Sequence, residues 1–229
     1  MTTISANLQA VRARIHEAAL KWGRNPADIT LLAVSKTWPA SAVQDAATAG
    51  QRAFGENYVQ EGVDKVTELQ ALRLEWHFIG PLQSNKTRRV AETFDWVHSI
   101  DRLKIAERLS EQRPDSLAPL QVCLQVNVSG EDTKSGVALE EAPELAKRIA
   151  LLPRLKLRGL MAIPAPVEDF SLQRLAFRRL RETFEQLNRS GLPIDTLSMG
   201  MSHDLEAAIA EGATMVRVGT AIFGERTKA

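Results

Sequence analysis

Residues 30–54 read TLLAVSKTWPASAVQDAATAGQRAF. This stretch begins with a short apolar segment at 30–34, continues with an alanine-rich amphipathic segment at 40–48, and passes through Gly50 to a second apolar segment at 52–54. Short apolar runs bounded by turn residues are typical of buried strands, and a longer amphipathic run that ends at glycine is typical of a helix. The stretch therefore predicts one unit of strand, helix and strand.

The same alternation continues along the chain. Further strands are predicted at 76–79, 96–99, 122–128, 157–161, 196–199 and 215–218, and further helices at 59–69, 84–93, 103–111, 139–151, 172–187 and 203–210. Only a short tail follows the last strand. Strict alternation predicts a parallel sheet, and eight such units predict an α/β fold with a closed (β/α)8 barrel of the TIM type. An open, doubly wound sheet is the alternative.

An additional helix is predicted before the first strand, within residues 1–25. Ile4, Leu8, Val11 and Ile15 recur at steps of three or four residues, which is the spacing of an amphipathic helix. Acidic residues interrupt the basic ones on its polar side, so we expect this helix to pack on the barrel and not to act as a membrane or targeting segment. Residues 1–229 are thus expected to form a single domain.

The composition narrows the class of protein. Hydrophobic residues make up 44% of the chain and charged residues 25%, which is typical of a folded globular protein. The formal net charge of +1 gives no overall attraction to nucleic acid or to an anionic membrane. The sequence shows neither a membrane span nor a secretory signal, so we expect a cytoplasmic location. The single cysteine, Cys123, excludes an internal disulfide and is expected to be a buried, inert thiol.

A phosphate site is predicted in two loops of the barrel. In barrels of this type the functional residues lie at the carboxyl ends of the strands, and phosphate often binds in the loops after the seventh and eighth strands. These loops contain SMGMS at 198–202 and the pair Gly219 and Thr220. Glycine allows close approach of the backbone to a phosphate, and hydroxyl groups donate hydrogen bonds to it. Each loop alone could be an ordinary helix cap or turn, but the two together favour a phosphate site.

Two cations are predicted near the same site. Arg217 shares a strand face with Met215 and Gly219, and it either pairs within the barrel or holds the ring or anion of a ligand. Lys36 follows the first strand on the face of Val34, at the rim where ligands bind. Burial and a nearby cation can lower the pKa of an ammonium group from ~10.4 toward ~7–8, which favours attack on a carbonyl. An aldehyde that bears a phosphate would satisfy both ends of the site, whereas a solvated Lys36 is the alternative.

These residues lie in motifs that resemble those of the pyridoxal phosphate homeostasis proteins, a family similar to the barrel domain of alanine racemase. The number, order and spacing of the motifs, which cover almost the whole chain, argue against chance similarity. The matching stretches are AVSKTWP at 33–39, FGENYVQEGVDK at 54–65, EWHFIGPLQSNK at 75–86, SGEDTKSGV at 129–137, RGLMAIP at 158–164, LSMGMSHDLEAAI at 197–209 and MVRVGTAIFG at 215–224.

The resemblance implies that pyridoxal 5'-phosphate (PLP) is bound covalently at Lys36, as a Schiff base. It further implies that the phosphate is cradled by the hydroxyl-bearing loops, that the Met201 backbone contributes, that Arg217 approaches the pyridine nitrogen and that Asn57 lines the pocket. The residues implied in binding PLP are Lys36, Asn57, Met201, Ser202, Arg217, Gly219 and Thr220. No catalytic residue and no metal site are expected.

Two lysine-related features bear on a second cofactor site. Many relatives carry a basic residue where this chain has Trp38, which puts in doubt any secondary lysine-linked site at that position. Lys134 matches a family lysine on another loop, and it is either a transfer site or a solvated lysine.

The resemblance implies a protein of intracellular PLP homeostasis that holds the cofactor and transfers it, without robust catalysis. Its expected partners are PLP and PLP-dependent apoenzymes, and we expect a monomer that binds neither nucleic acid nor membranes. The alternative is a PLP-dependent amino-acid racemase, which normally needs two positioned bases. In alanine racemase the opposing base is a tyrosine from a second domain, whereas nothing after Gly224 could form that domain and the single tyrosine, Tyr58, is expected at a helix start. A class I aldolase would share the barrel and the phosphate site but not the motifs.

Other polar residues are interpreted as structural. His77 is expected to be a hydrogen-bonded histidine of the barrel and not a catalytic one. His98 and His203 lack a metal-ligand spacing with acidic neighbours. The arginines of the helix at 172–187, which include Arg178 and Arg181, are expected to form a solvated helix surface.

Overall fold

Eight parallel strands form a closed barrel in the computed structural model, which describes residues 3–130 and 135–225. The strands pair in chain order, and the pairing of the last with the first closes the ring. They are β1 (Thr30–Val34), β2 (Ala53–Glu56), β3 (Glu75–Phe78), β4 (Trp96–Ile100), β5 (Leu120–Asn127), β7 (Leu155–Met161), β8 (Thr196–Ser198) and β9 (Met215–Val218). The predicted barrel is therefore confirmed, and the open sheet is wrong.

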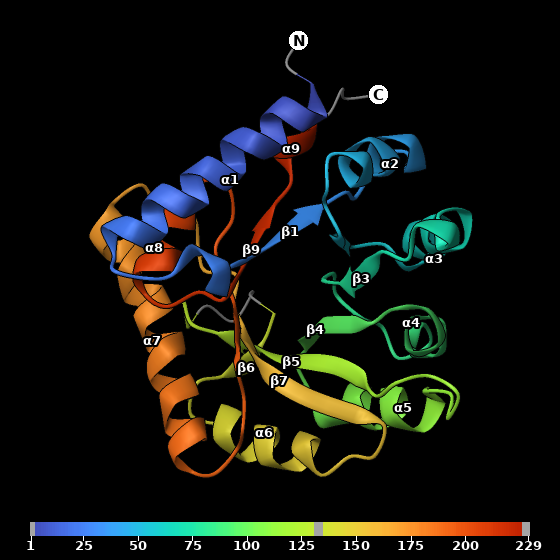
Figure 1. Ribbon diagram of the computed structural model, residues 1–229. Coiled ribbons are helices and arrows are strands. Elements are labelled where there is room, and N and C mark those ends of the chain that lie inside the picture. The colour runs from blue at the N-terminus through green and yellow to red at the C-terminus, as the bar shows by residue number, and fades with distance from the viewer. Residues whose placement is uncertain (1–2, 131–134, 226–229) are drawn as a thin grey trace.

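Helices follow the strands and form the outer layer of the barrel (Figure 1). They are α2 (Ala40–Thr48), α3 (Val59–Glu68), α4 (Thr87–Thr93), α5 (Leu103–Gln112), α6 (Ala142–Ala150), α7 (Phe170–Arg189) and α8 (Leu205–Ala210), with single 3-10 turns η1 (Pro26–Asp28) and η2 (Gln70–Leu72). Besides these 3-10 turns, two further elements were not predicted, the strand β6 (Val137–Ala138) and the helix α9 (Thr220–Phe223). They contain 2 and 4 residues, which is too short for a hydrophobic period to show.

The two-residue period of the strands separates an outer core from the barrel interior. Phe54 and Val216 belong to the outer core, which packs under the helices. Leu32, Ala53 and Met215 form a separate apolar cluster. Arg217 has the parity of Met215, which confirms that its side chain shares the inward face.

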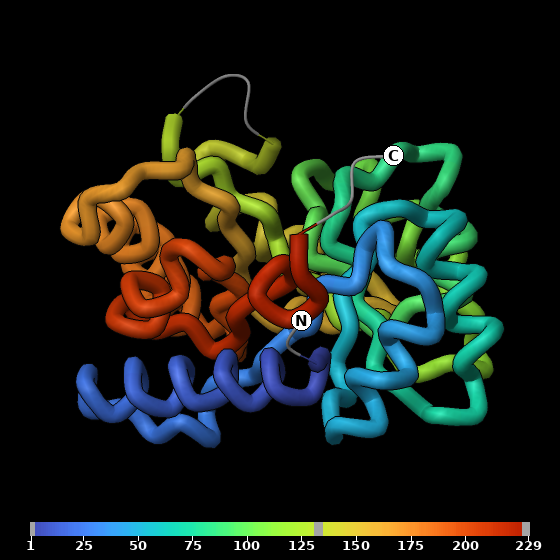
Figure 2. Tube along the Cα trace, turned by 90° about the horizontal axis from the view of Figure 1, so that it is seen from above, coloured from blue at the N-terminus to red at the C-terminus, as the bar shows by residue number. Residues whose placement is uncertain are grey.

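The N-terminal helix α1 (Ile4–Lys21) lies across α8 and α9, as Figures 1 and 2 show. It buries Leu8 against the outer core, which confirms that the amphipathic helix packs on the barrel. Arg14 Nη2 donates to the carbonyl of Ser202 (3.2 Å), and Asn7 Nδ2 donates to the carbonyl of Ile222 (2.8 Å). The helix α1 thus anchors the segments that follow β8 and β9. Among the described residues, no helix is long and apolar enough to cross a membrane.

Arg178 and Arg181, which were expected on a solvated surface of α7, keep 44% and 35% of their side chains exposed and also form ion pairs. Arg178 and Arg181, together with Arg174, converge on the carboxylate of Glu211, with N–O distances of 3.2, 3.2 and 2.7 Å respectively. Glu211 is fully buried, so its charge needs these partners. The three arginines therefore hold α7 against the segment that follows α8.

Candidate functional site

A cavity of about 230 Å³ opens at the carboxyl ends of the strands. It brings together all seven residues predicted to bind the cofactor, from β9 itself and from the segments that follow β1, β2, β8 and β9. Six further residues complete it that the sequence motifs did not assign to the site, namely Val34, Trp38, Ile79, Ile163, His203 and Gly224. Ile79 and Ile163 follow the period of their strands, so the strand-end rule could have found them.

A buried network of charges holds the segment that carries Lys36. Lys65 Nζ, from α3, donates to the Ser35 carbonyl (2.8 Å), to Glu56 Oε1 (2.8 Å) and to Glu61 Oε1 (2.6 Å). Ser35 Oγ also donates to Glu56 Oε1, and the backbone N–H of Thr37 donates to Glu61 Oε1. The residues on both sides of Lys36 are therefore fixed by the same three ionisable side chains.

Burial makes this network sensitive to any loss of charge balance. The side chain of Glu56 is fully buried and that of Lys65 is 6% exposed. Burial raises the pKa of Glu56, and the ion pair with Lys65 opposes this shift. Thr37 has a φ of 68°, a left-handed conformation that costs a residue other than glycine free energy. The bond from Thr37 to Glu61 compensates for this strain directly beside Lys36.

Asn57 also lines the pocket, and a close backbone contact fixes its position. A Cβ atom on Gly80 would lie 2.1 Å from the Asn57 carbonyl oxygen, so only glycine fits at that position. The side-chain oxygen of Asn57 is buried, and no residue in the described part of the chain is its hydrogen-bond partner. A buried polar atom without a partner costs about 1–3 kcal/mol, so this oxygen points to a ligand.

Arg217 is held by three hydrogen bonds, two to Ser198 on β8 and one to Ala162 after β7. Its Nη1 donates to the carbonyl (2.6 Å) and the hydroxyl (2.8 Å) of Ser198, and its Nη2 donates to the carbonyl of Ala162 (2.9 Å). The side chain lines the pocket although the residue is only 4% exposed. Burial lowers the pKa of Arg217 to about 10, so the guanidinium keeps its charge at neutral pH. Arg217 is thus both paired within the barrel and presented to the pocket.

The segment that follows β8 contains a competing hydrogen bond. The resemblance assigns the Met201 backbone to the ligand, and the backbone N–H of Met201 donates here to Asp204 Oδ1 at 2.6 Å. Burial raises the pKa of Asp204, whereas this bond and the charge of Arg217 lower it. Gly200, with a φ of 94°, turns the chain so that its carbonyl accepts from the backbone N–H of Arg217. Binding of a ligand to the Met201 N–H therefore requires Asp204 to release this group.

Trp38 forms one wall of the pocket and stacks on Phe223 of α9, with ring centroids 6.0 Å apart. The residue that departs from the family motif is therefore an apolar wall here.

Tyr58 is the N-cap of α3, as predicted, and it is 54% exposed and lies outside the pocket lining. Lys134 lies outside the described residues.

The remaining candidates from the sequence, His77 and Cys123, are buried in the barrel and do not line the pocket. His77 is fully buried and bonded to Glu75 and His98, which confirms the prediction of a hydrogen-bonded histidine of the barrel. Cys123 is fully buried, as predicted, and burial raises the pKa of its thiol to about 12. No group of three or more metal-ligating side chains occurs among the described residues.

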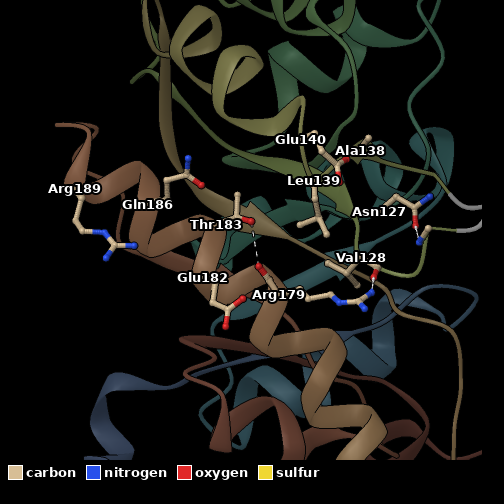
Figure 3. A pocket seen from close by; sticks show the side chains of 11 residues that line it. Asn127, Val128, Ala138, Leu139, Glu140, Arg179, Glu182, Thr183, Gln186 and Arg189 are labelled. Carbon is tan, nitrogen blue, oxygen red and sulfur yellow. Dashed lines mark hydrogen bonds between the residues drawn. The ribbon is translucent and has the colours of Figure 1, made fainter.

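A second cavity, of about 800 Å³, lies between α7 and the segments around β5 and β6 (Figure 3). Arg179 reaches across it to the carbonyl of Val128 (3.3 Å). Its lining contains Glu140 and Glu182 as well as Arg179 and Arg189, and none of its described lining residues is a lysine. It shares no residue with the pocket at Lys36 and is less suited to an aldehyde that bears a phosphate.

Comparisons with known proteins agree on one family. The model of the family "Alanine racemase, N-terminal domain" matches residues 4–227. The chain is 63% identical over 226 residues to the pyridoxal phosphate homeostasis protein of Pseudomonas aeruginosa, covering 99% of this chain and 97% of that protein. It is 60% identical over 229 residues to the protein of that name from Escherichia coli K12, covering 99% and 98% respectively.

Solved structures agree with the fold. The structure of PipY from Synechococcus elongatus, with PLP bound, is similar with a TM-score of 0.84 and 36% identity, covering 97% of this chain and 100% of that one. Alanine racemase from Corynebacterium glutamicum is similar with a TM-score of 0.70 at 18% identity, and the match covers 96% of this chain but 62% of the racemase. The second likeness shows the shared barrel alone.

Proposed function

Since the chain belongs to the family of pyridoxal phosphate homeostasis proteins, we propose that it binds PLP in the pocket at Lys36 and acts as a carrier that holds and releases this cofactor. The PLP-bound PipY structure supports the ligand class, because that protein aligns with 97% of this chain. The residues of the pocket support the mode of binding.

The observation that carries the proposal is the buried side-chain oxygen of Asn57, which has no partner among the described residues. It lies in a pocket with one primary amine, one buried guanidinium and the hydroxyl groups of Ser202 and Thr220. This donor set fits a small ring that carries a phosphate, an aldehyde and polar substituents. Ser202, Gly219 and Thr220 would hold the phosphate, Arg217 would contact the ring nitrogen, and Asn57 would contact a polar ring substituent.

Lys36 would hold the cofactor covalently. Bound PLP supplies an aldehyde that combines reversibly with primary amines. Lys36 Nζ would bond to the aldehyde carbon as a Schiff base with loss of water, and either water or another amine would break this bond again. The network around Lys65 keeps the flanking residues fixed, so Lys36 meets the aldehyde without reorganisation of its own segment.

A carrier fits the pocket better than an amino-acid racemase does. The charged guanidinium of Arg217 beside the ring nitrogen disfavours protonation there, which weakens the ring as an electron sink. The single tyrosine, Tyr58, is exposed outside the pocket, and the relatives are named homeostasis proteins. We therefore propose that the protein works without robust catalysis.

The test of the covalent bond is reduction by borohydride followed by peptide mapping. Protein incubated with PLP should show a visible absorption band, and the reduced cofactor should map to the peptide that contains Lys36. The variant Lys36→Ala should lose both signals, whereas Lys104→Ala, at an exposed position on α5, should keep them. An intact band and adduct in Lys36→Ala would refute the covalent assignment.

The test of the carrier role is transfer of PLP to a PLP-dependent apoenzyme. Loaded wild-type protein should restore the activity of the apoenzyme, and amino-acid enantiomers should not interconvert. Racemisation that Lys36→Ala abolishes would favour the alternative of a racemase. Five expectations stay predictions from the sequence. They are the transfer to PLP-dependent apoenzymes, the cytoplasmic location, the monomeric state, the single domain over residues 1–229 and a role for Lys134.

A further inference from the structure

A line of polar side chains crosses the interior of the barrel and ends at Arg217. Glu75 Oε1 lies 2.7 Å from His77 Nε2, and His77 Nδ1 lies 2.9 Å from His98 Nε2. His98 Nδ1 then lies 2.8 Å from Ser198 Oγ, which accepts from Arg217 Nη1 at 2.8 Å. The line starts on β3, passes through β4 and β8, and reaches the pocket on β9.

Burying these polar groups in the barrel lowers its stability unless each of them forms its hydrogen bonds. His77, His98 and Ser198 are fully buried, whereas the side chain of Glu75 is 47% exposed. The interiors of such barrels are usually filled by branched apolar side chains, and a buried polar group without a partner is destabilising. The line satisfies both ring nitrogens of each histidine.

The two ends of the line fix where each hydrogen lies. Arginine only donates, so Ser198 Oγ accepts from it, and His98 Nδ1 is the one acceptor that the described residues offer to the Ser198 hydroxyl hydrogen. His98 then carries its hydrogen on Nε2 and donates to His77 Nδ1, which leaves the hydrogen of His77 on Nε2, facing Glu75.

The same assignment follows from the opposite end. The hydrogen bond from His77 lowers the pKa of Glu75, so Glu75 is an ionised acceptor. Burial lowers the pKa of both histidines, which keeps them neutral. A neutral His77 that donates from Nε2 must accept at Nδ1, so every hydrogen bond in the line runs from Arg217 toward Glu75.

The line connects opposite charges. None of the ion pairs among the described residues contains Arg217, and Asp204 is the carboxylate that acts on it through space. Glu75 provides a second negative charge, and aligned hydrogen bonds in a medium of low dielectric constant polarise one another. Glu75 thereby makes Ser198 Oγ a better acceptor for Arg217. Arg158 and Asp95 are the other charged groups that act on Glu75 or His77.

We propose that Glu75, His77, His98 and Ser198 are positioning residues, which form one oriented relay that fixes the guanidinium of Arg217 toward the pocket. The relay occupies Nη1, and the Ala162 carbonyl occupies one hydrogen of Nη2. Among the described residues, Nε and the other hydrogen of Nη2 have no hydrogen-bond acceptor, so they remain for a ligand. The effect on the cofactor rests on the proposed function, whereas the orientation of the hydrogens does not.

The first test reads the histidine tautomers by ¹⁵N NMR in the protein without PLP. His77 and His98 should both show the neutral form with hydrogen on Nε2 at pH 7. A charged ring or a hydrogen on Nδ1 in either residue overturns the relay, whatever the protein binds. In Ser198→Ala, His98 should lose its single tautomer while the circular dichroism of the barrel is retained.

The second test measures PLP affinity by equilibrium dialysis. Ser198→Ala should weaken binding about tenfold, because Arg217 loses a charge-assisted hydrogen bond. Glu75→Gln keeps an acceptor for His77 but removes the charge, so the tautomers should persist while the affinity falls by a smaller factor. Asp115→Asn removes a charge whose side chain is 88% exposed and should change neither readout.

The outcomes separate this proposal from the proposed function. If wild-type protein does not bind PLP, the carrier function fails, and the NMR result alone decides the relay. If wild type binds PLP and both Ser198→Ala and Glu75→Gln bind it equally well, the relay has no role in positioning Arg217 and the proposal is wrong.

Discussion

Replacing Lys65 by methionine should destabilise the barrel more than a typical single substitution does. Methionine fills a similar volume but removes the charge that faces Glu56 and Glu61. Glu56 is fully buried, and its Oε2 has no partner among the described residues even with Lys65 present. Breaking a buried ion pair by removal of one partner costs about 3–5 kcal/mol. This is a large part of the 5–15 kcal/mol by which domains are typically stable.

Urea unfolding monitored by tryptophan fluorescence and circular dichroism measures this cost. With a typical slope of about 1–3 kcal/mol per M, a loss of this size should lower the midpoint of Lys65→Met by about 1–5 M. Adding Glu56→Gln removes the uncompensated charge, so the double variant should recover part of the loss. The coupling between the two substitutions should exceed about 1 kcal/mol. A loss below about 1 kcal/mol, or simple addition of the two single effects, would refute this account of the network.

The same variant separates stability from the position of Lys36. Lys65 donates to the Ser35 carbonyl, and that anchor stays lost when Glu56→Gln is added. We therefore expect the double variant to regain stability without regaining full PLP affinity. Equal recovery of both properties would mean that the network affects binding only through the stability of the barrel.

Three further predictions concern groups away from Lys36. Cys123 should not react with a thiol reagent in native protein at pH 8 and should react after unfolding, because its thiol is buried and has a pKa of about 12. Glu211→Gln should lower the free energy of unfolding by about 1–2 kcal/mol in urea titrations, a modest loss because the three arginines that it leaves are partly exposed and become hydrated. Burial lowers the pKa of His77 and His98 in the folded state, so below about pH 6.5 only the unfolded chain takes up these protons and stability falls with falling pH. The slope is about 1.4 kcal/mol per pH unit for each histidine, and unfolding of His98→Gln between pH 5 and 7 should show a smaller loss than wild type.

The alternation of apolar and amphipathic segments was enough to predict eight strands and their closure, but not where each strand ends. The second strand was expected at 52–54, whereas β2 runs from Ala53 to Glu56. Gly55 and Glu56 have the residue types of a turn. Gly55 is nevertheless packed against Leu32 and Ile79, and Glu56 is buried because Lys65 and Ser35 bond to it. These contacts come from other elements, so no local pattern contains them.

The site shows the same division between what is local and what is not. Two local features predicted residues of the site. They are the positions of Lys36 and Arg217 in the two-residue period of their strands, and the loops at the carboxyl ends of the strands. The fold brings these residues into one pocket. The relay depends on a pair such as His98 and Ser198, which lie 100 residues apart in the chain. Their contact depends on the closure and register of the barrel, so the sequence alone could interpret each residue only by itself.

Arg217 is where the stability of the barrel and the binding of a ligand depend on the same bonds. Its guanidinium connects β9 to Ser198 on β8 and to Ala162 after β7. A substitution of Arg217 therefore changes the packing of three strands as well as any contact with PLP, and its effect on cofactor retention cannot be attributed to the ring contact alone. Ser198→Ala and Glu75→Gln avoid this difficulty, because they alter the bonds that orient Arg217 and leave the guanidinium and the Ala162 carbonyl in place. The relay thus makes it possible to vary the electrostatics of the pocket without removing a residue that lines it.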